Sequence, residues 1–137
     1  MGADIYDFVV VDSKSRITIP LRIRKLLGIK EGMKLMIAAN SSRKEIRIIP
    51  IVGTQAKVNK LRVLMLDKPG VLAKVATILA DNNVDLLLTE SRTVRRGELA
   101  EWVIIADLAS CKLSVPELVE EIKKLDFVKE VEVSEID

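Results

Sequence analysis

The chain has 137 residues, of which 49% are hydrophobic and 31% are charged, so it can bury a core as one medium domain or as two small ones. Histidine is absent and the single cysteine is Cys111, which excludes histidine-based acid–base catalysis, nucleophilic triads, an internal disulfide and nearly every zinc site. We therefore expect a protein that is not an enzyme and that carries no metal and no cofactor.

Neither membrane insertion nor secretion is predicted. No apolar run approaches the roughly 18 residues that a helix needs to cross a bilayer, and no signal-peptide pattern opens the chain. A single cysteine also fits a reducing compartment. We expect a cytoplasmic protein without a membrane partner.

The net charge of +2 is unevenly distributed along the chain. Up to Gln55 there are ten Lys and Arg against five Asp and Glu, a balance of +5, whereas the remaining residues have twelve against fifteen, a balance of −3. This asymmetry indicates two parts with different roles, of which the basic one is the candidate for binding a polyanion. Aromatic residues make up only 3%, which argues against a protein that stacks single-stranded bases.

The first part of the chain predicts four short strands around one short helix. We expect strands over residues 5–12, 16–19, 34–39 and 45–51, and a helix over residues 20–27. Pro20 suits the first turn of that helix, and Gly28 suits a left-handed residue at its end. Elements this short make a thin core, so we expect a second copy of the chain to complete it.

The predicted helix has one apolar and one basic face. On a helical wheel Ile23, Leu26 and Leu27 share one side, while the basic residues Arg22, Arg24 and Lys25 lie on the other. No acidic residue occurs between Ser13 and Lys30, and uncompensated positive charge favours an external anion such as duplex DNA. Two other interpretations stay open, a solvated basic face and an internal ion pair of Arg24 with a carboxylate such as Asp12.

Residues 5–51 resemble the SpoVT/AbrB family of swapped-hairpin DNA-binding domains. The segment that carries the resemblance is DSKSRITIPLRIRKLLGIKEGMKL, residues 12–35, and seven of its positions match the family pattern: Arg16, Ile19, Pro20, Arg24, Leu27, Gly28 and Gly32. The resemblance implies a homodimer in which strands from two chains interleave into one barrel that binds double-stranded DNA.

The same resemblance implies DNA contacts by Arg16 in the loop and by Arg24 and Lys25 in the helix. Lys14 and Arg22 lie outside the family pattern, and we expect them either to contact phosphates or to be solvated. Ser15 departs from the family, which usually has glycine before the loop arginine, so the reach of that arginine depends on how serine adapts to the loop.

The second part of the chain predicts the ferredoxin-like order β-α-β-β-α-β. The expected elements are strands over 60–67, 84–95, 98–108 and 127–136 and helices over 69–83 and 114–126. The expected domains are 1–52, a mostly-β swapped-hairpin domain, and 60–137, an α+β domain, joined by a linker over 53–59. The residues predicted to cover the sheet are Val71, Leu72, Val75, Ile78 and Leu79 in the first helix and Leu118, Val119, Ile122 and Leu125 in the second.

Three smaller features of this part also carry predictions. Ser114 and Glu117 have the spacing of a capping box, with Pro116 in the first turn of the helix. Trp102 is expected in the core or an interface, and Asn82 and Asn83 are expected to end the preceding helix as its C-terminal cap.

Residues 60–136 resemble an ACT domain, a module that senses small molecules in amino-acid enzymes and transcription regulators. The resemblance rests on the element order and on the segment Asp-Lys-Pro-Gly-Val-Leu at the first strand-to-helix turn, and the effector-binding residues that it implies are Asp67, Lys68, Pro69, Gly70, Val71 and Leu72. The helix N-terminus would attract an amino-acid carboxylate, and the carboxylate of Asp67 would accept its ammonium group. The alternative is a domain that only dimerises and so makes a tetramer, and Asp85, where the family often has asparagine, favours this alternative.

Together these features predict a sequence-specific, DNA-binding transcription regulator whose second domain senses an amino acid or a related metabolite, mediates oligomerisation, or does both. An antitoxin-like DNA-binding protein that neutralises a protein partner is the alternative. The folded second part argues against it, because antitoxins of that type usually end in a disordered acidic tail.

Overall fold

The computed structural model describes residues 4–51 and 56–136. The chain forms two compact units, of which the first ends at Val52 and the second begins at Gly53. Within the described residues, no helix has the length and apolar character needed to cross a membrane.

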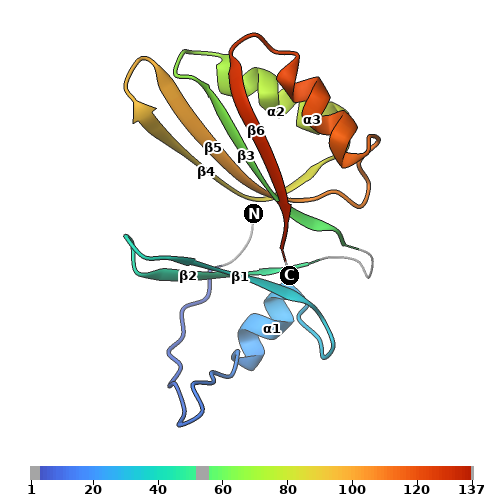
Figure 1. The fold of residues 1–137 in the computed structure, drawn as a ribbon. Coiled ribbons are helices and arrows are strands. Elements are labelled where there is room, and N and C mark those ends of the chain that lie inside the picture. Colours follow the sequence, from blue (N-terminus) through green and yellow to red (C-terminus); the bar gives the residue numbers. More distant parts are fainter. Residues whose placement is uncertain (1–3, 52–55, 137) are drawn as a thin grey trace. The chain divides into compact units, whose positions relative to one another are not determined.

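The second unit is a four-stranded antiparallel sheet with two helices, and it confirms the predicted β-α-β-β-α-β order (Figure 1). Its elements are β3 (Val58–Leu66), α2 (Val71–Asp81), β4 (Asp85–Arg95), β5 (Leu99–Asp107), α3 (Val115–Lys123) and β6 (Val128–Glu135). The strand order is β4-β5-β3-β6, so the two strands that follow the helices lie at the edges. The predicted linker is too long at its end, because Val58 and Asn59 already belong to β3, and its residues 53–55 lie outside the described ones.

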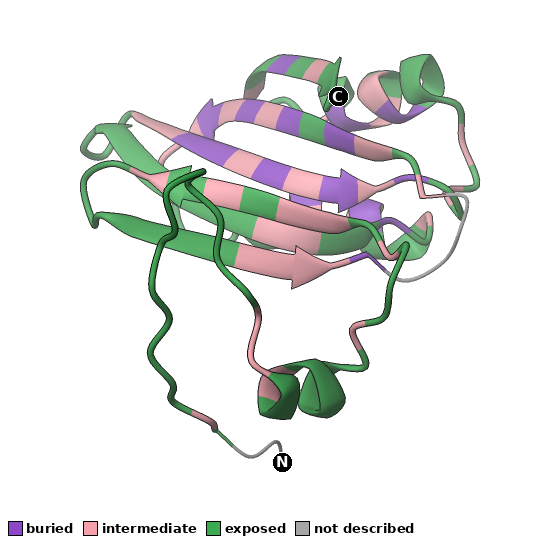
Figure 2. Cartoon of the chain, turned by 90° about the horizontal axis from the view of Figure 1, so that it is seen from below, coloured by how far each residue is buried: buried purple, intermediate pink, exposed green. Residues whose placement is uncertain are grey.

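The core of the second unit lies between the sheet and the two helices. Alternate residues of the central strands are buried, as expected for a sheet with one covered face: Leu61, Val63 and Met65 on β3, and Trp102, Ile104 and Ala106 on β5. The helices contribute Val71, Val75, Leu79, Leu118 and Ile122. Figure 2 shows the buried residues as bands along the central strands. The prediction that Trp102 belongs to the core is confirmed.

One predicted core residue, Leu72, lies elsewhere. Its side chain is 40% exposed, because the buried stripe of α2 runs at every fourth residue, through Val71, Val75 and Leu79. Leu72 lies about 100° around the helix from Val71 and therefore faces outward. At the far end of α2 the Asn82 side chain donates a hydrogen bond of 2.8 Å to the Ile78 carbonyl, which confirms the predicted cap.

The capping box at the start of α3 is confirmed. The Glu117 N–H donates to Ser114 Oγ at 3.3 Å, and the Ser114 N–H donates to Glu117 Oε1 at 3.2 Å. Hydrogen bonds from the Ser114 side chain and then from its N–H lower the pKa of the Glu117 carboxyl. The stabilisation from Glu117 is therefore present above its unfolded pKa of 4.5 and is lost as the pH falls through the lower folded value.

Replacing Ser114 by alanine is expected to reduce the free energy of unfolding by about 1 kcal/mol at neutral pH, because one helical N–H loses its acceptor. Urea unfolding followed by Trp102 fluorescence measures this loss. The difference between the two proteins should shrink as the pH falls through the lowered folded pKa of Glu117, because its carboxyl is protonated in both proteins below that value. A loss that stays unchanged at acid pH would contradict the role of the carboxylate.

The first unit contains α1 (Leu21–Leu27) and an antiparallel hairpin of β1 (Leu35–Asn40) and β2 (Glu45–Pro50). Pro20 lies at the N-cap, and Gly28, with φ of +68°, ends the helix as predicted. The hairpin pairs Leu35 with Pro50 and Asn40 with Glu45, so its turn lies where the sequence predicts it.

The strands predicted over 5–12 and 16–19 do not form in the single chain, where residues 4–20 contain no strand. A strand needs a neighbour that accepts and donates its backbone hydrogen bonds, and within one chain this segment has no strand beside it. A single chain therefore shows a helix and a hairpin, and the barrel stays a prediction. Consistent with a thin core, α1 contains no buried residue.

Candidate nucleic-acid interface and ligand cavity

The loop before α1 is organised around the carboxylate of Asp12. Its Oδ1 accepts hydrogen bonds from the backbone N–H groups of Lys14 at 2.8 Å and Arg16 at 3.0 Å, and its Oδ2 lies 2.9 Å from Arg16 Nε. The Asp12 N–H also donates to the Arg16 carbonyl at 2.9 Å. The N–H of Arg16, followed by that of Lys14, lowers the pKa of Asp12, so this carboxylate stays ionised at neutral pH.

This loop presents the side chain of Arg16, which is 68% exposed. The ion pair with Asp12 uses Nε, so the two terminal nitrogens remain as hydrogen-bond donors toward an outside acceptor. Asp12 thus orients Arg16 and does not pair with Arg24, which was the internal ion pair considered from the sequence. Lys14 lies in the same loop and is exposed.

Ser15 adopts the left-handed conformation, with φ of +60°. Glycine takes this conformation without the steric conflict of a Cβ atom, which explains why a glycine is usual at this position of the resembling family. Serine in this conformation therefore stores strain in the backbone of the loop.

Replacing Ser15 by glycine is expected to stabilise the folded chain by about 0.5–1 kcal/mol, because the relief of left-handed strain exceeds the greater flexibility of unfolded glycine. Ser15→Ala is the matched control, since it removes the hydroxyl but keeps the Cβ, and it should bring no gain. Denaturant unfolding of the three proteins measures the difference. Equal stability of the glycine and alanine variants would contradict the assignment of strain.

The basic residues of α1 have different surroundings. Arg24 Nε donates a hydrogen bond of 3.0 Å to the Ile19 carbonyl and so holds the chain entering the helix. Arg22 Nη2 lies 3.6 Å from Asp7 Oδ2 and 3.5 Å from the Tyr6 carbonyl, so it ties the preceding segment to the helix. Lys25 is exposed, like the other two. Arg16 and Arg24 are thus both held by the segment 12–19, and all five predicted DNA-contacting residues are exposed.

A cavity of about 210 Å³, here called the α2 cavity, lies in the second unit between the end of β3, the start of α2, and strands β4 and β5. Four predicted effector residues line it, namely Asp67, Lys68, Val71 and Leu72, whereas Pro69 and Gly70 do not. The other side of the cavity, which was not predicted from the sequence, is formed by Ser91, Arg92, Thr93, Ala100 and Glu101. Its volume is below the usual range for drug-sized ligands, which suits a small metabolite.

Asp67 has a structural role in this cavity. Its Oδ2 accepts a hydrogen bond of 2.9 Å from the N–H of Gly97, and its own N–H donates to the Glu98 carbonyl at 3.2 Å. The predicted ammonium acceptor thus also fixes the turn between β4 and β5, which holds one wall of the cavity in place. A ligand would share this carboxylate with Gly97.

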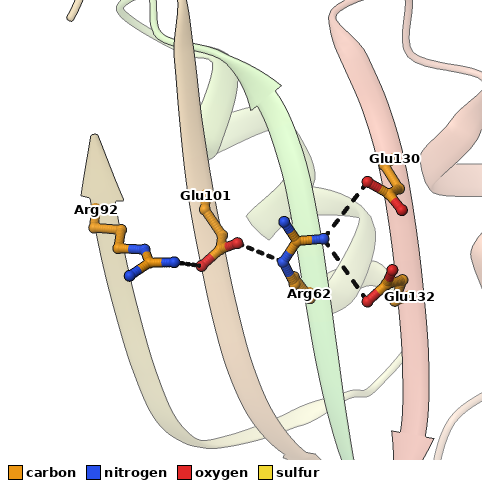
Figure 3. A network of polar contacts seen from close by, with 5 residues as sticks. All are labelled: Arg62, Arg92, Glu101, Glu130 and Glu132. Carbon is orange, nitrogen blue, oxygen red and sulfur yellow. Dashed lines mark hydrogen bonds and ion pairs between the residues drawn. The ribbon is translucent and has the colours of Figure 1, made fainter. Parts of the chain in front are cut away.

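Arg92, at the edge of the cavity, belongs to a chain of charges that crosses all four strands (Figure 3). Its Nη2 lies 3.1 Å from Glu101 Oε1, and the other Glu101 oxygen pairs with Arg62. Arg62 Nη1 lies 3.5 Å from Glu130 and 3.7 Å from Glu132. The hydrogen bond to Glu101 raises the pKa of Arg62.

This network lies on the face of the sheet opposite the helices, because Glu101 alternates along β5 with the core residue Trp102 and Arg92 is its cross-strand partner. Glu101 is nearly buried, with 6% of its side chain exposed, whereas the Arg92 side chain is 73% exposed. At the start of α2 the cavity is lined by Lys68 and Asp67, which supply one charge of each sign. Such a lining matches a zwitterion better than a simple anion or cation.

The N-terminus of α2 adds a further polar element beside the cavity. Gly70 is its N-cap in the left-handed conformation, with φ of +85°, and no side chain caps the helix there. The first N–H groups of an uncapped helix favour a carboxylate. Among the described residues, no group of three or more Cys, Asp or Glu side chains is placed to hold a metal ion.

Comparison with known proteins gives a match for the second unit. The model of the ACT domain family matches residues 60–127, and residues 1–59 lie outside the match. A UPF0735 ACT domain-containing protein from Caldicellulosiruptor saccharolyticus is 31% identical over 81 residues, which cover 59% of this chain and 53% of that protein. The chain therefore spans about half the length of this curated relative.

Two solved structures are similar to the chain. The C-terminal domain of the MgtC protein from Mycobacterium tuberculosis has a TM-score of 0.50 at 14% identity, covering 63% of this chain and 94% of that one. The ACT domain of GTP pyrophosphokinase from Chlorobium tepidum has a TM-score of 0.48 at 12% identity, covering 58% and 100%. The family match and the observed β-α-β-β-α-β sheet agree: residues 60–127 of this chain are an ACT domain.

Proposed function

We propose that this chain is a transcription regulator that binds double-stranded DNA through its first unit and senses a small metabolite through its ACT domain. The observation that carries the proposal is the exposed basic surface of the first unit, in which Arg16 is oriented by Asp12 and Arg24 is held against Ile19. Oriented arginines can contact guanine edges or phosphates with two hydrogen bonds, and Lys25 adds a point charge.

A second copy of the chain completes the first unit in this proposal. Large apolar side chains of the segment before α1 are exposed, including Phe8 at 99%, Val10 at 87% and Tyr6 at 85%. The same unit contains a mostly apolar groove of about 240 Å³ lined by residues such as Val9, Ile17 and Ile48. Exposed apolar surface of this extent marks an interaction site. The unpaired segment 4–20 would supply strands to a partner copy, as the SpoVT/AbrB resemblance implies.

Binding of a labelled random-sequence duplex, followed by fluorescence anisotropy, tests the DNA-binding function. We expect a dissociation constant between about 10⁻⁴ and 10⁻⁶ M at physiological salt, which weakens steeply as salt is added because phosphate contacts release counterions. Absence of binding at low salt and at about 10⁻⁴ M protein would contradict the proposal.

The ACT domain would bind its ligand in the α2 cavity. The uncapped α2 N-terminus and Lys68 would hold a carboxylate, while Asp67 would accept hydrogen bonds from an ammonium group. An amino acid or a related metabolite is the ligand class that carries both groups. Isothermal titration against the twenty amino acids separates a sensor from a domain that only dimerises, since no heat of binding from any of them would favour the latter.

Lys68→Ala is expected to weaken binding of the responding amino acid about tenfold or more, because a charge-assisted hydrogen bond to its carboxylate is lost. Lys74→Ala is the matched control, because it removes the same charge from α2 and does not line the cavity. Titration calorimetry of both variants measures the effect. Equal affinities for the two variants would place the ligand elsewhere.

Regulation would follow from linkage between the two units. A ligand that binds one packing of the ACT domains more tightly shifts the population toward it, and only this difference in affinity can change DNA binding. By the same linkage, DNA must change the affinity for the ligand by the same factor.

A further inference from the structure

A second cavity, here called the α3 cavity, lies in the ACT unit among the start of β3, the loop after β5, the start of α3 and the end of β6. Its volume is about 460 Å³, within the usual range for small-molecule sites, and none of its lining residues lines the α2 cavity. Its polar lining residues include Lys57, Asn59, Cys111, Ser114 and Glu135.

Asn59 is the feature that indicates a ligand. It lies on β3 in the same alternation as the core residues Leu61 and Val63, it is 8% exposed, and it lines the α3 cavity. Among the described residues, none of the hydrogen bonds uses its side-chain amide, and no fully buried side-chain nitrogen or oxygen lacks a partner. The amide therefore opens onto the cavity. A largely buried carboxamide that opens onto a cavity favours a molecule that supplies its hydrogen bonds.

The walls around Asn59 are fixed by hydrogen bonds. Asp107 Oδ1 accepts from the N–H groups of Lys57 at 2.9 Å and Ala109 at 3.0 Å, and the Leu108 N–H donates to the Lys57 carbonyl at 2.8 Å. The Cys111 N–H donates to the Leu108 carbonyl at 3.1 Å. The loop after β5 is thereby held against the start of β3, so the cavity is built by specific contacts.

The charges of the lining favour an uncharged ligand. The charged lining residues, Lys57 and Glu135, are exposed to water, so the buried polar group of the lining is the carboxamide of Asn59. The Ser114 capping box already occupies the N–H of Glu117, so the α3 N-terminus is poorly suited to an anion. A carboxamide offers a donor and an acceptor side by side, which match an amide or the edge of a nucleobase. Apolar walls are contributed by Leu108, Leu113, Val115 and Ile136.

We infer that the α3 cavity binds a small uncharged molecule that carries a hydrogen-bond donor and acceptor side by side, as a primary amide or a nucleobase does. Asn59 binds this edge, and the apolar walls pack against the rest of the molecule. Because Lys57 and Asn59 begin the ACT unit, a molecule bound there stabilises the chain where it enters that unit. The inference does not depend on a ligand in the α2 cavity.

Cys111 provides the test, because it lines the α3 cavity, is partly buried and is the single cysteine of the chain. The rate of its alkylation by iodoacetamide is measured on the full chain with increasing millimolar nicotinamide or adenine. We expect at least one of these probes to slow the reaction about threefold or more, with saturation. Nicotinamide tests the amide, and adenine tests the nucleobase edge.

Without a probe, Cys111 of the Asn59→Leu variant should be alkylated at nearly the wild-type rate, but the probe should no longer slow this reaction. Ser110→Ala is the control, because Ser110 lies in the loop of Cys111 but outside the cavity lining. This variant should still be protected by the probe. Nuclear magnetic resonance of the wild-type chain provides a readout that needs no variant. The probe should shift the amide signals of Asn59 and Cys111 rather than those of Arg92 and Thr93. Failure of both probes to protect Cys111, equal protection in Asn59→Leu, or shifts at the α2 cavity instead would overturn the inference.

Discussion

Replacing Leu79 by alanine is expected to lower the free energy of unfolding of the ACT unit by about 3 kcal/mol. Leu79 is fully buried on α2, within the core between the helices and the sheet, so the substitution removes apolar contacts and leaves a cavity. Trp102, the single tryptophan of the chain, lies in the same core and reports the unfolding through its fluorescence. Urea titration of the two proteins measures the loss.

Leu72→Ala is the matched control on the same helix. Its side chain is 40% exposed, so its truncation should reduce the stability by less than about 1 kcal/mol. Similar losses for the two variants would mean that α2 packs on the sheet with a different face from the one described.

Replacing Arg16 or Lys25 by alanine is expected to weaken duplex DNA binding and to flatten its salt dependence. Each phosphate contact that is lost should reduce the slope of the logarithm of affinity against the logarithm of salt concentration by about one. For the Arg16→Ala/Lys25→Ala double variant, this slope should therefore be shallower by about two. The double variant should also bind the duplex more weakly than the wild type at every salt concentration below the physiological one. Anisotropy titrations at several salt concentrations measure both quantities.

Lys129 is an exposed residue of β6, and Lys129→Ala is the control because it removes one positive charge from the ACT unit instead of the first unit. Its slope should equal that of the wild type. Arg24→Ala is a less suitable probe, since Arg24 also holds the Ile19 carbonyl, so its loss would disturb the segment before the helix. If Arg16→Ala and Lys25→Ala have the same slope as Lys129→Ala, these two residues are not DNA contacts.

Most elements could be predicted because local patterns determine them. The fourth-residue spacing of Val71, Val75 and Leu79 predicts a helix that covers a sheet, and the Ser114–Glu117 spacing predicts a capping box. Gly28 ends α1 as expected, because a left-handed residue is needed there. In each case the decisive contacts lie within one or two turns of the residue.

The predicted strands that the single chain does not show, and the ion pair that the sequence left open, depend on contacts that no local pattern contains. The segment over residues 5–12 has the composition of a strand, but a strand also needs a neighbouring one, and within a single chain none pairs with it. Whether Asp12 forms an ion pair with Arg16 or with Arg24 depends on the backbone conformation of the loop, which the charges alone do not determine.

The missed side of the α2 cavity could have been found from the hairpin. A two-residue turn at Arg96 and Gly97 places Arg92 opposite Glu101, and the structure pairs these two residues across β4 and β5. The burial of Glu101 could not be predicted in this way, because it depends on Arg62 from a third strand.

Sedimentation velocity of the full chain, alone and mixed with a labelled duplex at low salt, tests the central claim most directly. We expect a particle of at least twice the 15.3 kDa chain mass, because a second copy is proposed to complete the first unit, and we expect this particle to sediment together with the duplex. High salt should release the duplex but leave the particle intact, since apolar burial holds the copies together. A 15.3 kDa monomer that leaves the duplex to sediment at its own rate would contradict the account.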